Sequence, residues 1–84
     1  MSYTVEIKQS AQKELLGLPD NIYDRSMVIL ENLKENPRPS GCIKLKGLVD
    51  HYRIRVGNFR IIYTIQDKIL FVNVIGFPNR KDAY

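Results

Sequence analysis

The sequence predicts an α+β domain in which an N-terminal strand and a helix hairpin pack on one face of a mainly antiparallel β-sheet. Apolar residues recur at helical spacing in the first half of the chain, and β-branched and aromatic residues dominate the second half. The chain has 84 residues, 44% of them hydrophobic, which suits one compact core rather than two. We therefore expect residues 1–84 to form a single domain.

The first half should begin with a strand over residues 3–7, where apolar and polar side chains alternate. Helices are expected from Ser10 to Leu16 and from Asp20 to Glu35, with Ser10 and Asp20 as N-caps because short polar side chains accept hydrogen bonds from free backbone N–H groups. The core face of the second helix is expected to carry Ile22, Ser26, Ile29, Leu30 and Leu33.

The second half predicts three consecutive antiparallel strands, over residues 52–56, 59–65 and 69–75. Gly57-Asn58 is a two-residue turn sequence of the kind that tolerates positive φ, and residues 66–68 form the second reversal. Helices that precede a strand meander are expected to cover one face of the sheet and to leave the other face open.

The predicted turn fixes which strand residues face one another. With Gly57-Asn58 as the loop, Arg55 stands opposite Arg60, and Arg53 stands opposite Ile62. These three arginines then share the face that the helices leave open. The opposite, covered face should carry Tyr52, Ile54, Val56, Phe59, Ile61 and Tyr63.

The shared arginine face favours an anionic partner. Two arginines opposite each other on paired strands repel by a few tenths to about 1 kcal/mol, and these strands offer no carboxylate on that face. A polyanion would relieve the repulsion, and the planar guanidinium suits phosphate because it donates two hydrogen bonds to neighbouring oxygens. The alternative is that the arginines only solvate the outer face of the hairpin.

Positive charge is concentrated in the second half, where residues 41–84 hold eight basic and three acidic side chains, against five and six in residues 1–40. Lys44 and Lys46 precede the hairpin and could extend the basic patch, or could simply be solvated. After the last strand, Arg80 could reach a phosphate and Tyr84 could stack on a base, although chain ends are often frayed.

Several kinds of site are excluded or disfavoured by the composition. Cys42 is the only cysteine, so neither an internal disulfide nor a thiolate zinc site is expected. The lone His51 is assigned no chemistry, and no glycine-rich phosphate loop or Ser/His/Asp set is present, so we expect no cofactor and no metal. The apolar runs are far too short to span a membrane, and a cytoplasmic location is expected.

Three segments together resemble the RelE/ParE superfamily of microbial toxins from toxin–antitoxin operons. They are Lys44-Leu45-Lys46-Gly47, then Tyr52-Arg53-Ile54-Arg55-Val56-Gly57-Asn58-Phe59-Arg60-Ile61-Ile62-Tyr63, and the ending Asn79-Arg80-Lys81-Asp82-Ala83-Tyr84. The resemblance implies a RelE-like microbial RNase fold. In the RelE branch it implies a ribosome-dependent endoribonuclease that cuts mRNA in the A site. In the ParE branch the same fold inhibits DNA gyrase.

For the RelE branch, the resemblance implies attack of a ribose 2′-OH on the adjacent phosphate without a metal. The implied catalytic residues are Arg53, Arg55, Arg60, Arg80 and Tyr84, and the implied RNA contacts are Lys44, Lys46 and Lys81. The implied partners are a cognate antitoxin, the ribosome and mRNA, with operator DNA bound only through the antitoxin. The alternatives are a gyrase inhibitor and a non-catalytic component that only binds its antitoxin.

Overall fold

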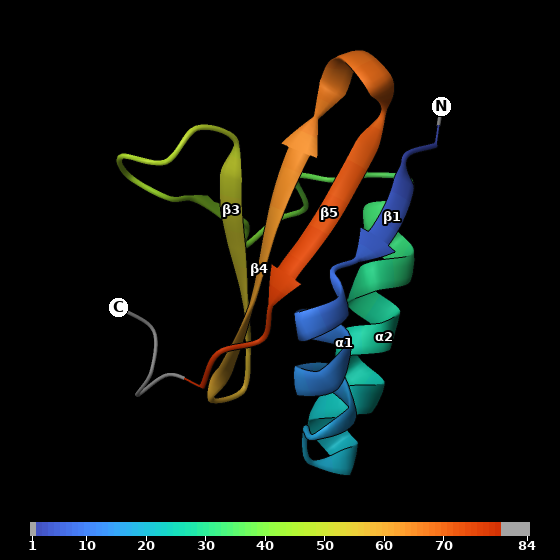
Figure 1. Ribbon diagram of the computed structural model, residues 1–84, viewed down its shortest axis with the longest axis vertical. Coiled ribbons are helices and arrows are strands. Elements are labelled where there is room, and N and C mark those ends of the chain that lie inside the picture. Colours follow the sequence, from blue (N-terminus) through green and yellow to red (C-terminus); the bar gives the residue numbers. More distant parts are fainter. Residues whose placement is uncertain (1, 80–84) are drawn as a thin grey trace.

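The computed structural model describes residues 2–79 and confirms the α+β class (Figure 1). The elements follow the chain in the order β1 (Thr4–Ile7), α1 (Gln9–Leu16), α2 (Asp20–Leu33), β2 (Ile43–Lys44), β3 (His51–Val56), β4 (Phe59–Gln66), the short 3₁₀ helix η1 (Asp67–Ile69) and β5 (Phe71–Gly76). Within the described part of the chain, no helix combines the length and the apolar character needed to cross a membrane.

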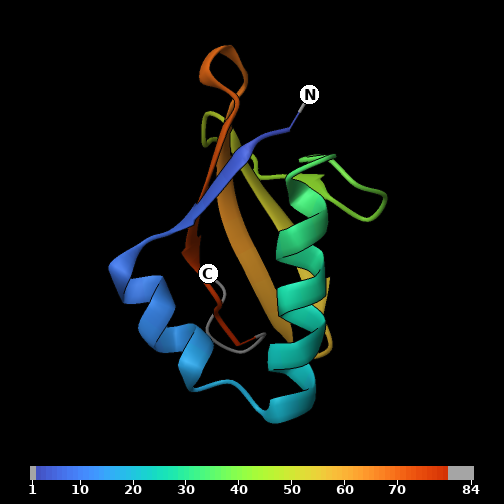
Figure 2. The same ribbon diagram turned by 90° about the vertical axis from the view of Figure 1, so that its right-hand side faces the viewer.

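All five strands form one sheet in the order β1-β5-β4-β3-β2. β1 runs parallel to β5, and every other pair is antiparallel. Both helices lie on the same side of this sheet, and in Figure 2 they lie in front of its strands. The prediction of one covered and one open face is therefore confirmed. β2 is an additional edge strand that the sequence did not predict, because two residues are too short to produce an alternating pattern.

The hydrophobic core fills the space between the helices and the sheet. Leu33 of α2 and Ile61 of β4 are completely buried there, together with Val72 and Val74 of β5. Burying one such side chain is worth about 1.5–3 kcal/mol, so these contacts hold the helical layer against the sheet. Of the predicted core positions on α2, Ile29 is only partly buried, whereas the others are buried.

The register of the β3–β4 hairpin agrees with the prediction in every pair. Val56 pairs with Phe59, Arg55 with Arg60 and Arg53 with Ile62. One feature of the open face was not expected, since Ile62 is only 6% exposed although it points away from the helices. A buried apolar side chain therefore lies beside the arginines on this face.

The predicted N-caps were wrong, by two residues in α1 and by one in α2, and α2 ends at Leu33 instead of Glu35. α1 begins at Gln9 with Lys8 as its N-cap, and α2 begins at Asp20 with Pro19 as its N-cap. Neither N-cap donates or accepts a side-chain hydrogen bond. Asp20 instead occupies the first turn, where a carboxylate interacts favourably with the positive end of the helix dipole. The last strand also starts later than predicted, because Leu70 adopts a left-handed conformation with φ 52°.

Candidate functional site

The turn between β3 and β4 positions the candidate site. Gly57 has a positive φ of 60°, whereas Asn58 does not, which is the pattern of a type II′ hairpin turn. A Cβ atom on Gly57 would lie 2.8 Å from Cδ1 of Ile22 on α2. Glycine is therefore required both by the backbone conformation and by the close approach of the helix. This turn sets the register that places the arginines on one face.

The arginine cluster, which we define as Arg53, Arg55 and Arg60, lies together on the open face. Arg53 and Arg55 are alternate residues of β3, so their Cα atoms are about 7 Å apart on the same side of the strand. Arg60 lies directly across from Arg55 on β4. Arg55 is exposed, while Arg53 and Arg60 are half-buried. The side chains alternate with the buried Ile54 and Val56, which anchor β3 to the helical layer.

Among the described residues, no acidic group pairs with the β3 members of this cluster. Within residues 2–79, neither Arg53 nor Arg55 forms an ion pair. The hollow at the hairpin end, lined by Arg55, residues 57–59 and Arg60, has a volume of only about 20 Å³. That is room for about one water molecule. Within residues 2–79, the cluster is thus an open, positively charged surface and not an enclosed pocket.

The two predicted lysine contacts are placed differently from the arginines. Lys44 pairs with Tyr52 on the neighbouring strand, which puts it at a register position of the helix-covered face. Its neighbour Ile43 pairs with Arg53 and takes the open-face position. Lys46 lies in the β2–β3 loop, beside a hollow of about 540 Å³ lined by residues 44–49. A contact of these lysines with RNA stays a prediction.

The segment after β5 returns to the hairpin. The backbone N–H of Phe77 donates a hydrogen bond to Oε1 of Glu14 on α1, at 2.9 Å. The N–H of Arg60 then donates to the carbonyl of Pro78 at 3.0 Å, and Asn79 forms a β-bridge with Phe59. The described chain therefore ends beside the arginine cluster. The predicted site residues Arg80, Lys81 and Tyr84 lie outside the described residues.

A network around Arg38 holds the α2–β2 linker against the sheet. The Arg38 guanidinium donates two hydrogen bonds to Asp67, with Nη2 2.8 Å from Oδ2, and its Nε donates to the Tyr52 hydroxyl at 3.2 Å. The same guanidinium lies 5.2 Å from the centroid of the Tyr52 ring, which stacks on Tyr63. Tyr3 adds a hydrogen bond to Oδ1 of Asp67 at 2.7 Å. The network joins β1, the linker, β3, β4 and η1.

Tyr63 anchors the same linker from inside the core. Its hydroxyl is 2.8 Å from the Pro37 carbonyl oxygen and 3.2 Å from Sγ of Cys42. The hydroxyl has one proton, which it donates to the carbonyl because a carbonyl can only accept, and the Cys42 thiol is then the donor to the hydroxyl oxygen. Burial raises the pKa of Tyr63 above its ordinary value, so the phenol stays neutral. Cys42 is thus accommodated as a packing residue and a weak donor.

The Arg38–Asp67 pair predicts a specific dependence of stability on pH. The Arg38 and Tyr3 hydrogen bonds lower the pKa of Asp67 from 3.8 to about 2. A carboxylate with a depressed folded-state pKa stabilises the protein at pH values above its unfolded pKa and loses that contribution as the pH falls toward the folded value. Asp67→Asn should therefore lower the free energy of unfolding near neutral pH, and the difference from wild type should shrink between about pH 4 and pH 2.

Chemical denaturation at a series of pH values measures this difference. Glu31→Gln is the matched control, because within residues 2–79 the Glu31 carboxylate pairs only with Lys34, the C-cap residue of the same helix, at 3.0 Å. Its effect should be smaller, since such exposed pairs contribute little to stability. A difference between Asp67→Asn and wild type that stays constant from neutral pH to pH 2 would contradict the assigned role of Asp67.

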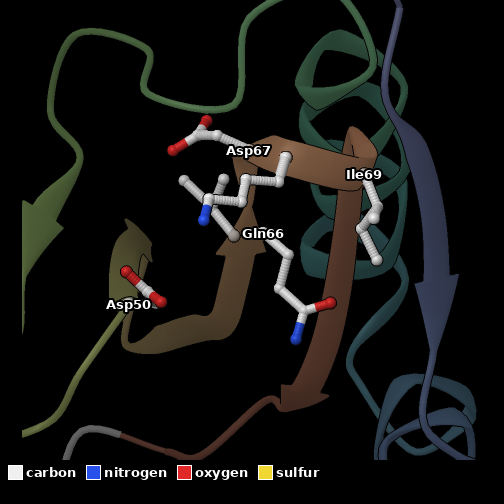
Figure 3. Close-up of a pocket in the computed structure, with 6 residues that line it drawn as sticks. Asp50, Gln66, Asp67 and Ile69 are labelled. Carbon is white, nitrogen blue, oxygen red and sulfur yellow. The ribbon is translucent and has the colours of Figure 1, made fainter.

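Another hollow lies at the opposite end of β4 from Arg60. It measures about 460 Å³ and is lined by Asp50 and residues 65–69. Figure 3 shows the side chain of Gln66 between Asp50 and Ile69. The Asp67 carboxylate points away from the Gln66 side chain. Two carboxylates and a single lysine make this hollow a poor match for a phosphate. The arginine cluster is therefore the better candidate for the functional surface.

Comparison with known proteins is consistent with the geometry. Residues 5–84 match the family model described as the ParE toxin of the type II toxin-antitoxin system parDE. The chain is 34% identical to a putative toxin RelE1 of Methanocaldococcus jannaschii over 100% of this chain and 97% of that protein. The matching family model thus bears the name of one branch of the superfamily, and the curated relative bears the name of the other.

Solved structures of RelE–RelB complexes have the same fold. The archaeal RelE–RelB complex of Pyrococcus horikoshii OT3 contains a chain that is 32% identical, with a TM-score of 0.86 and coverage of 99% of this chain and 100% of that chain. The intact Escherichia coli RelBE complex matches with a TM-score of 0.81 and 28% identity over 93% of this chain and 96% of that chain. Fold, length and sequence therefore agree that this chain is a member of the RelE/ParE family of toxins from type II toxin–antitoxin systems.

Proposed function

We propose that this toxin is a ribosome-dependent endoribonuclease that cleaves mRNA in the ribosomal A site and so inhibits translation. The observation that carries the proposal is the arginine cluster, three guanidinium groups on one uncovered face with no ion pair to Arg53 or Arg55 in residues 2–79. Such a surface has the charge and the hydrogen-bond donors to hold an RNA phosphate. A toxin that acts on ribosomes would work in the cytoplasm.

The proposed reaction needs no redox step. The ribose 2′-oxygen attacks the adjacent phosphorus, the bond from phosphorus to the 5′-oxygen breaks, and the 5′-oxygen leaves as a hydroxyl after taking up a proton. Negative charge grows on the phosphoryl oxygens in the transition state, where Arg53 and Arg60 would stabilise it. Arg80 would assist the leaving oxygen, and Tyr84 would stack on the displaced base.

The proton on the 2′-OH requires a different group, because arginine stays protonated at neutral pH. Arg55 occupies a position for contact with the substrate but is a poor base. A ribosomal group could accept the proton, or the ribosome could hold the 2′-oxygen in line with the leaving bond and so raise the rate. The small hollow at the cluster agrees with a role for the ribosome, because the hollow does not itself enclose a nucleotide.

The partners follow from the same proposal. RelE chains occur with RelB in the complexes from P. horikoshii and E. coli, and we infer a cognate antitoxin for this chain. An antitoxin with an acidic or amphipathic segment would neutralise the basic face or cover the helices. Operator DNA would be bound only through the antitoxin.

One incubation experiment distinguishes the two branches of the family. Purified toxin is mixed with ribosomes carrying an mRNA and a vacant A site, with the same mRNA free in solution, and with DNA gyrase in a supercoiling assay. We expect cleavage on the ribosome, intact free mRNA and unchanged supercoiling. Intact mRNA on the ribosome together with inhibited supercoiling would instead support the gyrase inhibitor, which the matching ParE family model keeps as the second candidate.

A third outcome concerns the possibility that the chain only binds its antitoxin. If neither mRNA nor gyrase is affected, and induction of the toxin alone does not arrest growth, the chain would be a non-catalytic component of its operon. Mapping mRNA 5′ ends after brief induction provides the cellular counterpart, because A-site cleavage should place the ends in phase with codons.

A further inference from the structure

The open face carries a second group of polar side chains beside the arginine cluster. Asn73 of β5 pairs with Thr64 of β4, and Thr64 pairs with His51 of β3 on its other side. Side chains paired across neighbouring strands have Cβ atoms about 5 Å apart. Val72 and Val74 are completely buried in the core, so Asn73 between them points to the open face. Thr64 and Asn73 thus form a polar pair on the uncovered side.

Asparagine is an unfavourable residue at this position. Asn is depleted in strands, and β5 is an interior strand with β1 on one side and β4 on the other. Asn73 and Thr64 are half-buried, and among residues 2–79 no hydrogen-bond partner is found for either side chain. A partly buried amide without a protein partner gains from a ligand that satisfies it. Positions that violate a local preference in this way are often functional.

The charge distribution across the sheet indicates how a nucleic acid would lie on this face. The positive charge of the arginine cluster lies over β3 and β4, whereas the exposed Glu6 of β1 pairs with Asn73 from the other side. A phosphate backbone is attracted to the first region and repelled by the second. The backbone should therefore follow β3 and β4, with its bases directed toward β5. Arg53 is two residues from His51, so Thr64 and Asn73 are offset from Arg53 by about 7 Å along the strands, and they lie about 5 Å and about 10 Å from β3 across the sheet.

We propose that the Thr64–Asn73 pair binds the base of the nucleotide next to the cleaved phosphate and sets the base preference of the toxin. This inference rests on the proposed nuclease function. An asparagine amide offers a donor and an acceptor side by side, which matches the edge of an unpaired base, and the Thr64 hydroxyl can donate or accept. Phe71, two residues before Asn73 on the same face, provides an aromatic ring on which the base can stack.

His51, Thr64 and Asn73 form a row across β3, β4 and β5. The His51 ring does not compete with Asn73 for the base. Its Nδ1 lies 2.6 Å from the Val49 carbonyl oxygen, which can only accept, so Nδ1 carries a proton. This hydrogen bond fixes the orientation of the ring at the β3 end of the row. The amide of Asn73 is then the group in the row with both a donor and an acceptor available on one flat edge.

Two substitutions test the inference without disturbing the strands. Thr64→Val and Asn73→Val remove the polar groups and introduce a residue that strands favour. Thr4→Val is the control. Thr4 is likewise a strand residue on the open face, but it is exposed and lies on β1, opposite Phe71. Cleavage rates are measured on ribosomes carrying mRNAs in which each base of the A-site codon is varied in turn.

We expect wild-type toxin and Thr4→Val to prefer one base at one codon position by about 5- to 150-fold, the discrimination of a good two-point base contact. In Asn73→Val this ratio should fall to about threefold or less, and Thr64→Val should reduce it partially, while cleavage of the disfavoured codons continues at a similar rate. Thr64→Ser should restore the preference, because it restores the hydroxyl.

Three results would overturn the inference. An unchanged order of codons in Asn73→Val would show that the amide does not contact a base. An equal loss of rate on every codon would assign the pair to general binding. Intact mRNA with wild-type toxin would refute the proposed function and this inference together, whereas the first two results leave the nuclease function standing.

Discussion

Arg53→Gln should lower the single-turnover rate of A-site mRNA cleavage by about 100-fold or more. Arg53 belongs to the arginine cluster and has no ion-pair partner within residues 2–79, so its positive charge is available to the phosphate. Glutamine keeps much of the length of the side chain and two donors but loses the charge and the planar fork. The loss should therefore fall on the transition state, in which charge accumulates on the phosphoryl oxygens.

The control for this variant is Lys13→Gln. Lys13 is an exposed residue of α1, on the other side of the sheet, and the substitution removes one positive charge there. Its cleavage rate should stay within about threefold of wild type, because exposed charges beyond a Debye length are largely screened. Arg53→Lys separates charge from geometry and should recover only part of the rate. A rate for Arg53→Gln equal to that of Lys13→Gln would remove Arg53 from the catalytic assignment.

Gly57→Ala should destabilise the fold by about 1–3 kcal/mol and weaken cleavage at the same time. The residue has a φ of 60°, and the new Cβ would meet Cδ1 of Ile22 at 2.8 Å. Ile22 is buried, so its side chain can move only by disturbing the contact between α2 and the hairpin. The same substitution strains the turn that aligns Arg55 with Arg60, which is why cleavage should also weaken. Chemical denaturation and the ribosome assay measure the two effects.

Gly47→Ala separates the strain from the close contact. Gly47 also has a positive φ, of 75°, but a Cβ there meets no described atom within 4 Å. Gly47→Ala should therefore show the backbone strain alone and should be the less destabilised of the two variants. If Gly57→Ala and Gly47→Ala lower the free energy of unfolding by the same amount, the contact with Ile22 does not contribute to the destabilisation.

The architecture could be predicted because its main signals are local. Two adjacent residues, Gly57 and Asn58, determine the hairpin turn, and alternation then assigns each neighbouring side chain to a face. The turn and the alternation therefore suffice to predict that Arg53, Arg55 and Arg60 share one face, and the observed register agrees. Whether they act on RNA is a separate question, which the substitutions above address.

The parts that were missed depend on contacts between distant residues. Arg38 and Asp67 are 29 positions apart, and Glu14 binds the backbone of Phe77 across 63 positions. An arginine between two prolines carries no local signal of such a partner. The start of α1 was also misplaced. The backbone N–H of Lys8 donates a hydrogen bond to the carbonyl of Val74, so β1 ends and α1 begins at this residue.

The candidate site was predicted incompletely for a similar reason. Thr64 and Asn73 are unremarkable in their own strands, and only the pairing of β4 with β5 brings them together. That pairing contains an irregularity between Ile62 and Tyr63, which alternation alone does not reveal. The position of Lys44 on the helix-covered side likewise follows from β2, a strand too short to recognise.

The parallel pairing of β1 with β5 has a consequence for the synthesis of the toxin. β5 is inserted between β1 and β4, so the first strand made has no neighbour in the sheet until the last strand has been translated. The nascent chain cannot complete its sheet while residues 71–76 are still inside the translating ribosome. A protein proposed to attack ribosomes therefore has an incomplete sheet until β5 has been translated.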